Sequence, residues 1–405
     1  MKASFPVLGF LAASGWLACI AFPGGISGGS VLAPLDIFPN LFSEFRYMDP
    51  EAPGIPENHH VIDQATYDLP LQHLIYQSIR KNILPWWDPY TFGGRPLLAD
   101  AHVNGTDPLR CLLYRLAPFP LAYNWNLMLK SVLTGLGMFL LLRFLGQPIL
   151  LAALLGLCFQ FAGAFALFFG HPWIQASFLF YPLLWIVWSR RLSGGGRWGA
   201  VLGPILCALV FFCGNLQSHS YLPLFAAAFC LAAFTESRGH GWRALGISAW
   251  SLGTGALLAA PILFSQIEFF HLSVRPISPR AWSPLELFHG PLSLTGMFPW
   301  LLGTFRTVDL CRGFQAGSLG FALFVGTVPF LLALITLADA WRGGGRLHFA
   351  ERWAAVLLLG YLAVQSTPLA RFLATRISPL ACLGLVILAS TALGRIREWN
   401  DLHRR

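Results

Sequence analysis

The chain has 405 residues, 56% of them hydrophobic and only 11% charged, with a mean hydropathy of +0.60. Soluble globular proteins carry roughly 25% charged residues, and disordered chains lack the 14% of aromatic residues found here, so both classes are excluded. The formal net charge of +9 does not indicate nucleic acid as a partner, because the Lys and Arg are dispersed among short loops. The composition therefore predicts a polytopic membrane protein with no nucleic-acid partner.

Apolar segments predict about ten transmembrane helices in an all-α membrane domain that covers residues 1–405. They lie at 5–23, 121–142, 149–169, 174–189, 200–213, 221–235, 245–264, 317–338, 353–365 and 377–394. The first is read as an anchor, not as a cleaved signal peptide, because Phe22-Pro23-Gly24 is a poor cleavage site. Since 200–213 is short, the polar turn 214–220 is expected below the membrane surface, lining a protein-walled or watery cavity.

Charged residues predict the orientation of these spans. With a cytoplasmic N-terminus, basic residues are several times denser in the inner loops than in the outer ones, so both termini are expected in the cytoplasm. Lys130 is left inside the second predicted span. More than half of the 18 Asp and Glu fall in the first outer loop, 24–120, where water and chemistry are expected to meet.

The first outer loop contains a predicted amphipathic helix. Asp68 is its expected N-cap, Pro70 lies in the first turn, and apolar residues continue at helical spacing to Ile83. Such a one-sided helix is expected to lie in the membrane interface, with Trp86 and Trp87 as an aromatic anchor after it.

Three stretches resemble the YfhO-like family of bacterial integral membrane proteins. They are Asp63-Gln64 followed by Pro70, the run Leu84-Pro85-Trp86-Trp87-Asp88-Pro89-Tyr90-Thr91-Phe92-Gly93-Gly94-Arg95-Pro96-Leu97, and Leu141-Leu142-Arg143-Phe144-Leu145-Gly146. Further matches are Gly170-His171, Gly214-Asn215-Leu216-Gln217, and Ala260-Pro261 through Glu268 to Ser273-Val274-Arg275. Asn215 stands where a histidine is expected in the family. The resemblance covers roughly residues 31–340.

This resemblance implies a GT-C architecture and the activity of a glycosyltransferase in the bacterial cytoplasmic membrane. Such an enzyme takes a sugar from a polyprenyl-phosphate carrier and passes it to a cell-envelope acceptor on the extracytoplasmic face. An acidic residue soon after the first span commonly serves as base or metal ligand in this group, and here that role falls on Asp63 or Asp36. The chain stops shortly after its last predicted span, whereas many relatives carry extra spans or an outer domain.

The transfer needs a carboxylate to take the acceptor's proton and a cation to hold the departing phosphate. On a regular helix Asp63 and Asp68 would diverge by ~140°, so only one of them is expected to face a cavity. Arg275 and Arg280 of the second large outer loop, 265–316, and then Arg95, are the candidates for the phosphate.

Further substrate-binding candidates are Asp68, His171, Asn215, Gln217, His219 and Glu268. Each has a structural alternative: Asp68 as a helix cap, His171 as a helix-end histidine, Glu268 as an ion-pair partner of Arg275. The polar turn of Asn215, Gln217 and His219 is stronger as a group, because a buried turn must find partners.

Several alternatives stay open. A divalent cation would fit acids near a phosphate, but no ligand spacing specifies one. The chain could also be a non-catalytic subunit that keeps the fold within a larger membrane complex, or a flippase for lipid-linked sugars; the lack of an internal repeat weighs against transport. Cys111 and Cys311 lie in the outer loops and could be bridged.

Overall fold

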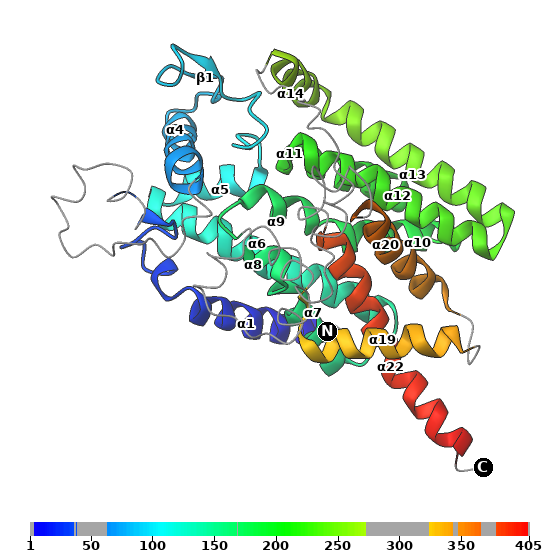
Figure 1. Cartoon of the computed structure of the whole chain (residues 1–405). Coiled ribbons are helices and arrows are strands. Elements are labelled where there is room, and N and C mark those ends of the chain that lie inside the picture. The colour runs from blue at the N-terminus through cyan, green and yellow to red at the C-terminus, as the bar shows by residue number, and fades with distance from the viewer. Residues whose placement is uncertain are drawn as a thin grey trace, which may run out of the picture.

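The computed structural model describes residues 4–35, 38, 63–167, 169–272, 324–342, 347–365 and 378–403. These residues are mostly helical (Figure 1). In chain order the elements are α1 (Ser4–Ala21), η1 (Pro23–Gly25), the π-helix η4 (Gln64–Asp68), α4 (Leu69–Arg80), β1 (Trp87–Asp88), β2 (Arg95–Pro96), α5 (Pro108–Leu116), α6 (Phe119–Phe144), α7 (Ile149–Gln160), α8 (Gly163–Leu167), α9 (Pro172–Phe178), α10 (Tyr181–Leu192), α11 (Gly199–Cys213), α12 (Leu216–Glu236), α13 (Arg238–Leu258), α14 (Ala260–Leu272), α19 (Thr327–Trp341), α20 (Phe349–Gln365) and α22 (Ser378–His403).

Four helical segments of this described part are long and apolar enough to cross a membrane. They are Phe119–Phe144, Ile149–Ala166, Ser218–Glu236 and Ser378–Ile396, and the bent pair α13–α14 makes a fifth if it counts as one span. Three further apolar helices, Phe5–Ala21, Gly199–Cys213 and Thr327–Trp341, are shorter. The prediction of a helical protein with several membrane-compatible helices is confirmed, and the number of about ten spans stays a prediction.

Two predicted spans are interrupted. The segment 174–189 contains the end of α9 and most of α10, with a turn at Leu179 and Phe180 before Pro182 in the first turn of α10. The segment 245–264 bends by 78° between α13 and α14, next to Pro261. Proline lacks the N–H that would continue the preceding helix, so apolar length alone overestimated the length of these helices.

The helices that follow α6 pack around large buried aromatic side chains. Trp188 of α10 and Trp353 of α20 are fully buried, and both contact Phe225 of α12 ring to ring. The long C-terminal helix α22 packs against α19 and α20. The first-loop elements pack beside this core.

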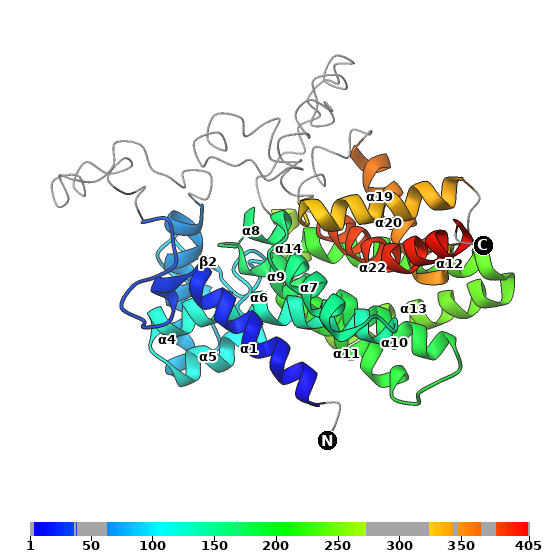
Figure 2. The ribbon, with the colours of Figure 1, turned by 90° about the horizontal axis from the view of Figure 1, so that it is seen from below.

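The first-loop elements form a small core of their own. Leu71 and Ile75 of α4 are buried against Val103 and against Leu113 and Tyr114 of α5. The predicted amphipathic helix therefore exists, and other residues of the same loop cover part of its apolar face. Its expected position in the membrane interface stays a prediction. Figure 2 shows α4 and α5 together at one end of the molecule, away from the turn between α12 and α13.

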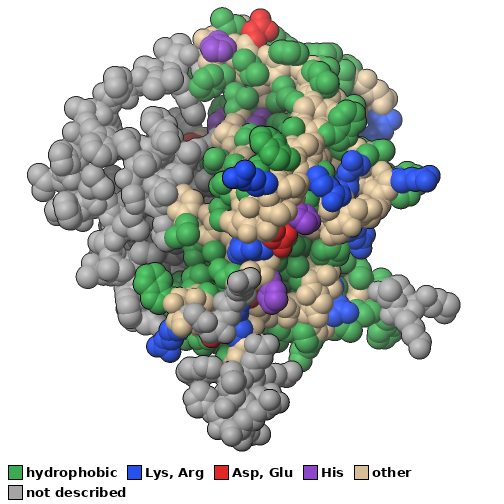
Figure 3. Space-filling view, turned by 90° about the vertical axis from the view of Figure 1, so that its right-hand side faces the viewer, with side chains coloured by type: hydrophobic (Ala, Val, Ile, Leu, Met, Phe, Trp, Pro, Cys, Tyr) green, Lys and Arg blue, Asp and Glu red, His purple; other side chains and the backbone are tan. Residues whose placement is uncertain are grey.

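Charge separates the two ends of α12. Its C-terminal Glu236 pairs with Arg352 of α20 at 2.8 Å, and Arg238 begins α13 directly afterwards. Glu351, which directly precedes Arg352, pairs with Arg395 of α22 at 2.7 Å. Figure 3 shows the face of the molecule at this end, where basic side chains outnumber acidic ones on the described surface. The N-terminal end of α12 leads to the site described next.

Candidate functional site

A cavity of about 750 Å³ lies where the first-loop segment 63–102 meets α9, the start of α12 and α14. The loop contributes Asp63, Thr66, Tyr67, Asp68, Phe92, Arg95, Ala99, Asp100, Ala101 and His102 to its lining, and the helical bundle contributes His171, Trp173, Asn215, Leu216, Gln266, Phe269 and Phe270. Five residues predicted for the site thus line one cavity although they are far apart in sequence: Asp63, Asp68, Arg95, His171 and Asn215.

Asp63 and Asp68 lie about one turn of a π-helix apart. The N–H of Leu69 bonds to the carbonyl of Gln64, five residues earlier, which defines the π turn. Both residues line the cavity, so the expectation that only one of them would face it is wrong. It assumed an α-helix, and the wider π turn makes the angle between residues five apart much smaller. Asp68 also fails as the predicted N-cap, because its backbone is helical and its side chain makes no capping bond.

The environments of the two carboxyl groups differ. Asp63 is exposed, whereas Asp68 has only 4% of its surface exposed. Burial raises the pKa of Asp68 to about 8; the charges of Asp100 and Asp63 add to the rise, and Arg110 opposes it. The Asp68 carboxyl group therefore keeps its proton at neutral pH and can donate a hydrogen bond.

The Arg95 guanidinium contacts two carboxylates and the Tyr67 ring, and within the described residues one of its nitrogen atoms stays unpaired. Its Nε lies 3.2 Å from Asp88 and its Nη1 lies 3.0 Å from Asp100. Nη1 also donates to the Tyr67 hydroxyl at 2.8 Å, and that hydroxyl donates to Asp100. Among the described residues, the buried Nη2 has no hydrogen-bond partner. A fixed guanidinium with a spare donor is suited to an anionic ligand.

The Trp-Asp-Pro-Tyr and Gly-Gly residues of the quoted motif build the hairpin that positions Arg95. In the antiparallel pair of β1 and β2, Asp88 is opposite Arg95. Asp88 also accepts the Tyr90 N–H at 2.9 Å, which shapes the turn. Gly94 has φ +115°, and a Cβ there would lie 2.7 Å from the Trp87 ring. The motif is thus explained by local geometry, with Arg95 as the side chain that it presents.

His171 enters the site beside a tight contact. A Cβ on the preceding Gly170 would lie 1.8 Å from Oε1 of Gln64, so only glycine fits there without a shift. The Gln64 amide is itself fixed, because its Nε2 donates to the Leu32 carbonyl at 2.9 Å and to the Tyr123 hydroxyl at 3.1 Å. Gln64 therefore holds the π turn against both α6 and the chain before α9.

Asn215 has a structural role as well as a place in the cavity. Its Oδ1 accepts the Ser218 N–H at 2.8 Å, and its own N–H donates to Ser218 Oγ at 2.8 Å. This capping box starts α12 at Leu216, so the predicted irregular turn over 214–220 is wrong for most of its length. With Oδ1 occupied, the Nδ2 group of Asn215 is the part left for a ligand.

The other predicted residues are placed differently or lie outside the described residues. His219 is buried against Phe211 and does not line the cavity. Glu268 is exposed on α14 and is not part of the lining. The side chain of Gln217 and the residues Asp36, Arg275 and Arg280 lie outside the described part.

Most of the other lining residues were missed by sequence reasoning, among them Tyr67, Asp100 and Gln266. Gln266 lies on α14 with 2% of its surface exposed, and within the described residues its Oε1 has no hydrogen-bond partner. An amide near the end of a predicted apolar span was the available signal, because polar groups at such positions need partners.

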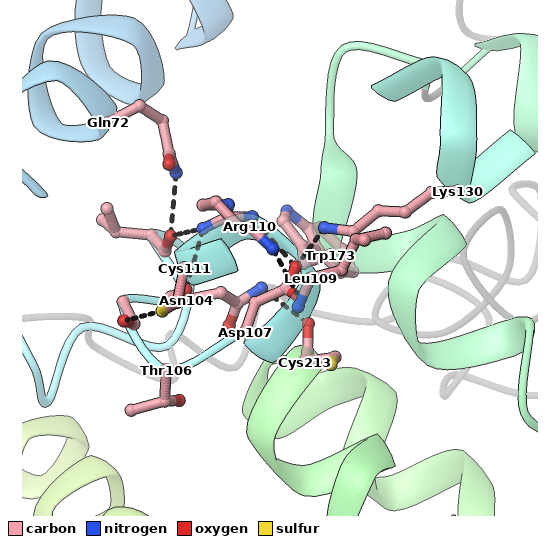
Figure 4. A network of polar contacts seen from close by, with 12 residues as sticks. Gln72, Asn104, Thr106, Asp107, Leu109, Arg110, Cys111, Lys130, Trp173 and Cys213 are labelled. Carbon is pink, nitrogen blue, oxygen red and sulfur yellow. Dashed lines mark hydrogen bonds and ion pairs between the residues drawn. The ribbon is translucent and has the colours of Figure 1, made fainter. Parts of the chain in front are cut away.

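A buried polar network fixes the loop to the bundle (Figure 4). Asp107 caps α5 by accepting the N–H groups of Leu109 at 3.1 Å and Arg110 at 3.3 Å, and its other oxygen pairs with Lys130 of α6. The Arg110 guanidinium lies 3.7 Å from the same oxygen. All three charged side chains are at most 1% exposed. The lone charge of the second predicted span thus has a partner from the first loop.

Two further bonds of this network reach α11. Asn104 Nδ2 donates to the Cys213 carbonyl at 2.8 Å, and Thr106 Oγ1 donates to the Phe212 carbonyl at 3.0 Å. These carbonyls lie in the last turn of α11 and have no helical donor there. The loop therefore caps the helix that leads directly into Asn215, which links the two walls of the cavity.

Metal and disulfide chemistry can be tested only within this described part. There, no group of three or more His, Cys, Asp or Glu side chains is arranged to hold a metal ion, so a divalent cation stays a prediction for the chain as a whole. Cys111 has a free thiol that contacts the Gly105 carbonyl at 3.5 Å, and Cys311 lies outside the described residues.

Comparison with known proteins identified no relative. No family model matches the chain, and neither the curated proteins nor the solved structures contain a significant match. The resemblance to YfhO-like proteins therefore depends on the quoted motifs alone.

Proposed function

We propose that this chain is a GT-C-type glycosyltransferase of the bacterial cytoplasmic membrane. It moves a sugar from a polyprenyl-phosphate carrier to a cell-envelope acceptor on the extracytoplasmic face. The observation that carries the proposal is that Asp63, Asp68 and Arg95 line one cavity at the junction of the acidic loop and the apolar helices. Carboxyl groups and a guanidinium with a spare donor are the groups that this transfer requires.

The orientation is supported by the two ends of α12. The helix has 21 residues and is therefore ~30 Å long, close to the thickness of the hydrocarbon core. Asn215, at its start, lines the cavity, and Glu236, at its end, pairs with Arg352 on the face rich in basic residues. By the positive-inside rule that face is cytoplasmic, so the cavity opens outside, as expected for about ten spans with both termini in the cytoplasm.

In the proposed reaction the anomeric carbon changes partners. Its bond to the carrier phosphate oxygen breaks, and that oxygen leaves with the electron pair as part of the phosphate. The acceptor hydroxyl oxygen forms the new bond to the anomeric carbon, and its proton passes to a carboxylate. Inversion follows, because the acceptor attacks from the face opposite to the phosphate.

The two carboxyl groups suit different roles in this step. Asp63 is exposed and takes the proton of the acceptor hydroxyl. Asp68 is buried and protonated, so it donates a hydrogen bond to the carrier phosphate, which Arg95 of the same cavity binds through its spare Nη2. A neutral carboxyl donor stabilises the phosphate without adding a second negative charge. Arg275 and Arg280, which lie outside the described residues, are further candidates for binding this phosphate.

Transfer of radiolabelled sugar from a polyprenyl-phosphate carrier, measured with protein in native membranes, tests the proposal. Asp63→Asn should lower transfer by at least about a hundredfold, because it removes the base. Asp68→Asn should keep much of the activity, because the amide still donates, whereas Asp68→Leu should lose it. Glu236→Gln, at the other end of α12, is the matched control and should leave transfer unchanged.

The alternatives are separated by the same measurement. Equal transfer by wild type, Asp63→Asn and Asp68→Leu would exclude both carboxyl groups from the reaction. If the wild type transfers no sugar but co-purifies with other membrane proteins, the chain is a non-catalytic subunit. Movement of the lipid-linked sugar across vesicles without transfer would indicate a flippase.

A further inference from the structure

The two walls of the cavity have opposite hydrogen-bonding needs. On the loop side, Nη2 of Arg95 is a buried donor without a partner among the described residues. On the α14 side, Oε1 of Gln266 is a buried acceptor that likewise has none there. Arg95 and Gln266 both line the cavity, from opposite walls. Buried polar atoms in folded proteins nearly always have partners, so an unpaired donor on one side and an unpaired acceptor on the other indicate a ligand that supplies both.

The chemistry of each wall selects a different part of that ligand. An ionised phosphate has only acceptor oxygens, so it suits Arg95 and would repel the Gln266 carbonyl oxygen. A hydroxyl group both donates and accepts, so it can satisfy Gln266. Asn215 adds a donor on the bundle side, because its Oδ1 is already bonded to the Ser218 N–H. A donor and an acceptor together are typical of a site for neutral hydroxyl groups.

The same wall offers apolar surface. Trp173 of α9 and Phe269 of α14 line the cavity, two residues after His171 and three residues after Gln266, respectively. Ligand sites commonly combine aromatic side chains with a few polar groups that fix orientation. Carbon-bound hydrogens of a sugar ring would be covered by such side chains, whereas a second phosphate would not.

Resting on the proposed function, we infer that the cavity binds its ligand in one orientation. The phosphate lies at Arg95, and the hydroxyl groups of the sugar lie at Gln266 and Asn215. Gln266 is then the residue that distinguishes a carrier bearing a sugar from the bare carrier. Gln266 determines the preference for the sugar-bearing carrier, and Arg95 supplies the phosphate affinity that the bare and the sugar-bearing carrier share.

The test compares the binding of two kinds of ligand to full-length protein in lipid nanodiscs. The probes are a tritiated polyprenyl monophosphate and the same carrier with glucose, mannose or galactose on the phosphate. In the wild type at least one sugar-bearing carrier should bind more tightly than the bare carrier. Gln266→Leu should lower that ratio about fivefold, the effect of one neutral hydrogen bond, and leave the bare carrier unchanged. Arg95→Gln should weaken all the probes together.

Two further variants protect the test against a folding defect. Gln266→Glu keeps the size and the acceptor oxygen, so it should retain the ratio that Gln266→Leu loses. Ser265→Ala, the neighbouring change on α14, should behave like the wild type. If no sugar increases wild-type binding, or if Gln266→Leu weakens bare and sugar-bearing carriers equally, the inference is overturned. If the wild type does not bind even the bare carrier, the proposed function fails instead.

Discussion

Lys130 of α6 and Asp107, the N-cap of α5, form an ion pair in which 1% of each side chain is exposed. Breaking a buried pair by removing one partner typically costs about 3–5 kcal/mol, because the other charge stays buried. Arg110 adds a second cation next to Asp107. Asp107→Ala would leave two cations uncompensated, whereas Lys130→Met would leave Asp107 paired with Arg110.

We therefore expect Asp107→Ala to destabilise the protein more than Lys130→Met, with both effects well above 1 kcal/mol. The thermal midpoint of purified protein in detergent measures the order. Arg352→Gln breaks the pair with Glu236, whose side chains are 27% and 33% exposed, and should cost less than about 1 kcal/mol. Equal, small effects of all three changes would show that the buried network does not stabilise the loop.

The buried Asp68 predicts how stability depends on pH. Its pKa rises from 3.8 to about 8 on folding, so the folded state holds a proton that the unfolded state releases. The stability from this site is fully present below pH 3.8 and is lost progressively as pH rises towards 8, at up to about 1.4 kcal/mol per pH unit. Asp68→Asn should therefore show a smaller fall in thermal midpoint than the wild type over this range. Identical curves would mean that Asp68 does not titrate in this way.

The same proton predicts a pH profile for the proposed transfer. If protonated Asp68 donates to the phosphate, wild-type transfer falls as pH rises through about 8, because the donor becomes a second anion. Asp68→Asn keeps an N–H donor that does not titrate in this range, so its transfer should not fall there. The ratio of wild-type to Asp68→Asn rates, measured across that range, isolates the effect. A ratio that rises with pH would instead make Asp68 the base.

Sequence reasoning identified the right segments more successfully than it described their geometry. The Asp-Gln pair, the hairpin motif, Gly170-His171 and the start of α12 all meet at one cavity. The meeting of these segments could be predicted from their polar residues, because polar groups in so apolar a chain need contact with water or with one another. Long-range pairs such as Lys130 with Asp107 could not be assigned, since many acids of the loop were equally plausible partners.

Local geometry was the less predictable part. The π turn at Gln64–Asp68 depends on one extra residue between hydrogen-bonded groups, which no apolar spacing reveals. The apolar face of α4 predicted a surface in need of cover, but lipid and other loop residues can cover it equally well, and Val103 and Leu113 do so. Pro182 and Pro261 indicated that helices end near them. The sequence prediction gave more weight to the length of the apolar segments and so placed a single span across each proline.

Gly170 offers a test of the contact that holds the π turn. In Gly170→Ala the new Cβ would lie 1.8 Å from Oε1 of Gln64, so the amide must move away from Leu32 and Tyr123. We expect a loss of about 1–3 kcal/mol in stability, as for other overpacked positions. The matched control is Gly253→Ala on α13, where nothing lies within 4 Å of the added Cβ. The double variant Gly170→Ala/Gln64→Ala should lose less stability than the sum of the losses in the two single variants. If the losses simply add, the two residues do not interact.

The orientation can be tested by chemical labelling of single added cysteines in intact cells. Tyr90, 82% exposed near the tip of the hairpin, lies at the cavity end, and Arg197 is exposed between α10 and α11 at the basic end. Because basic loops stay in the cytoplasm, Tyr90→Cys should react with a membrane-impermeant maleimide from outside, and Arg197→Cys only after permeabilisation. The parent chain measures the background from native cysteines, none of which is exposed among those described. The reverse pattern of labelling would place the cavity on the cytoplasmic side, where a polyprenyl-phosphate sugar for export to the envelope could not be its substrate.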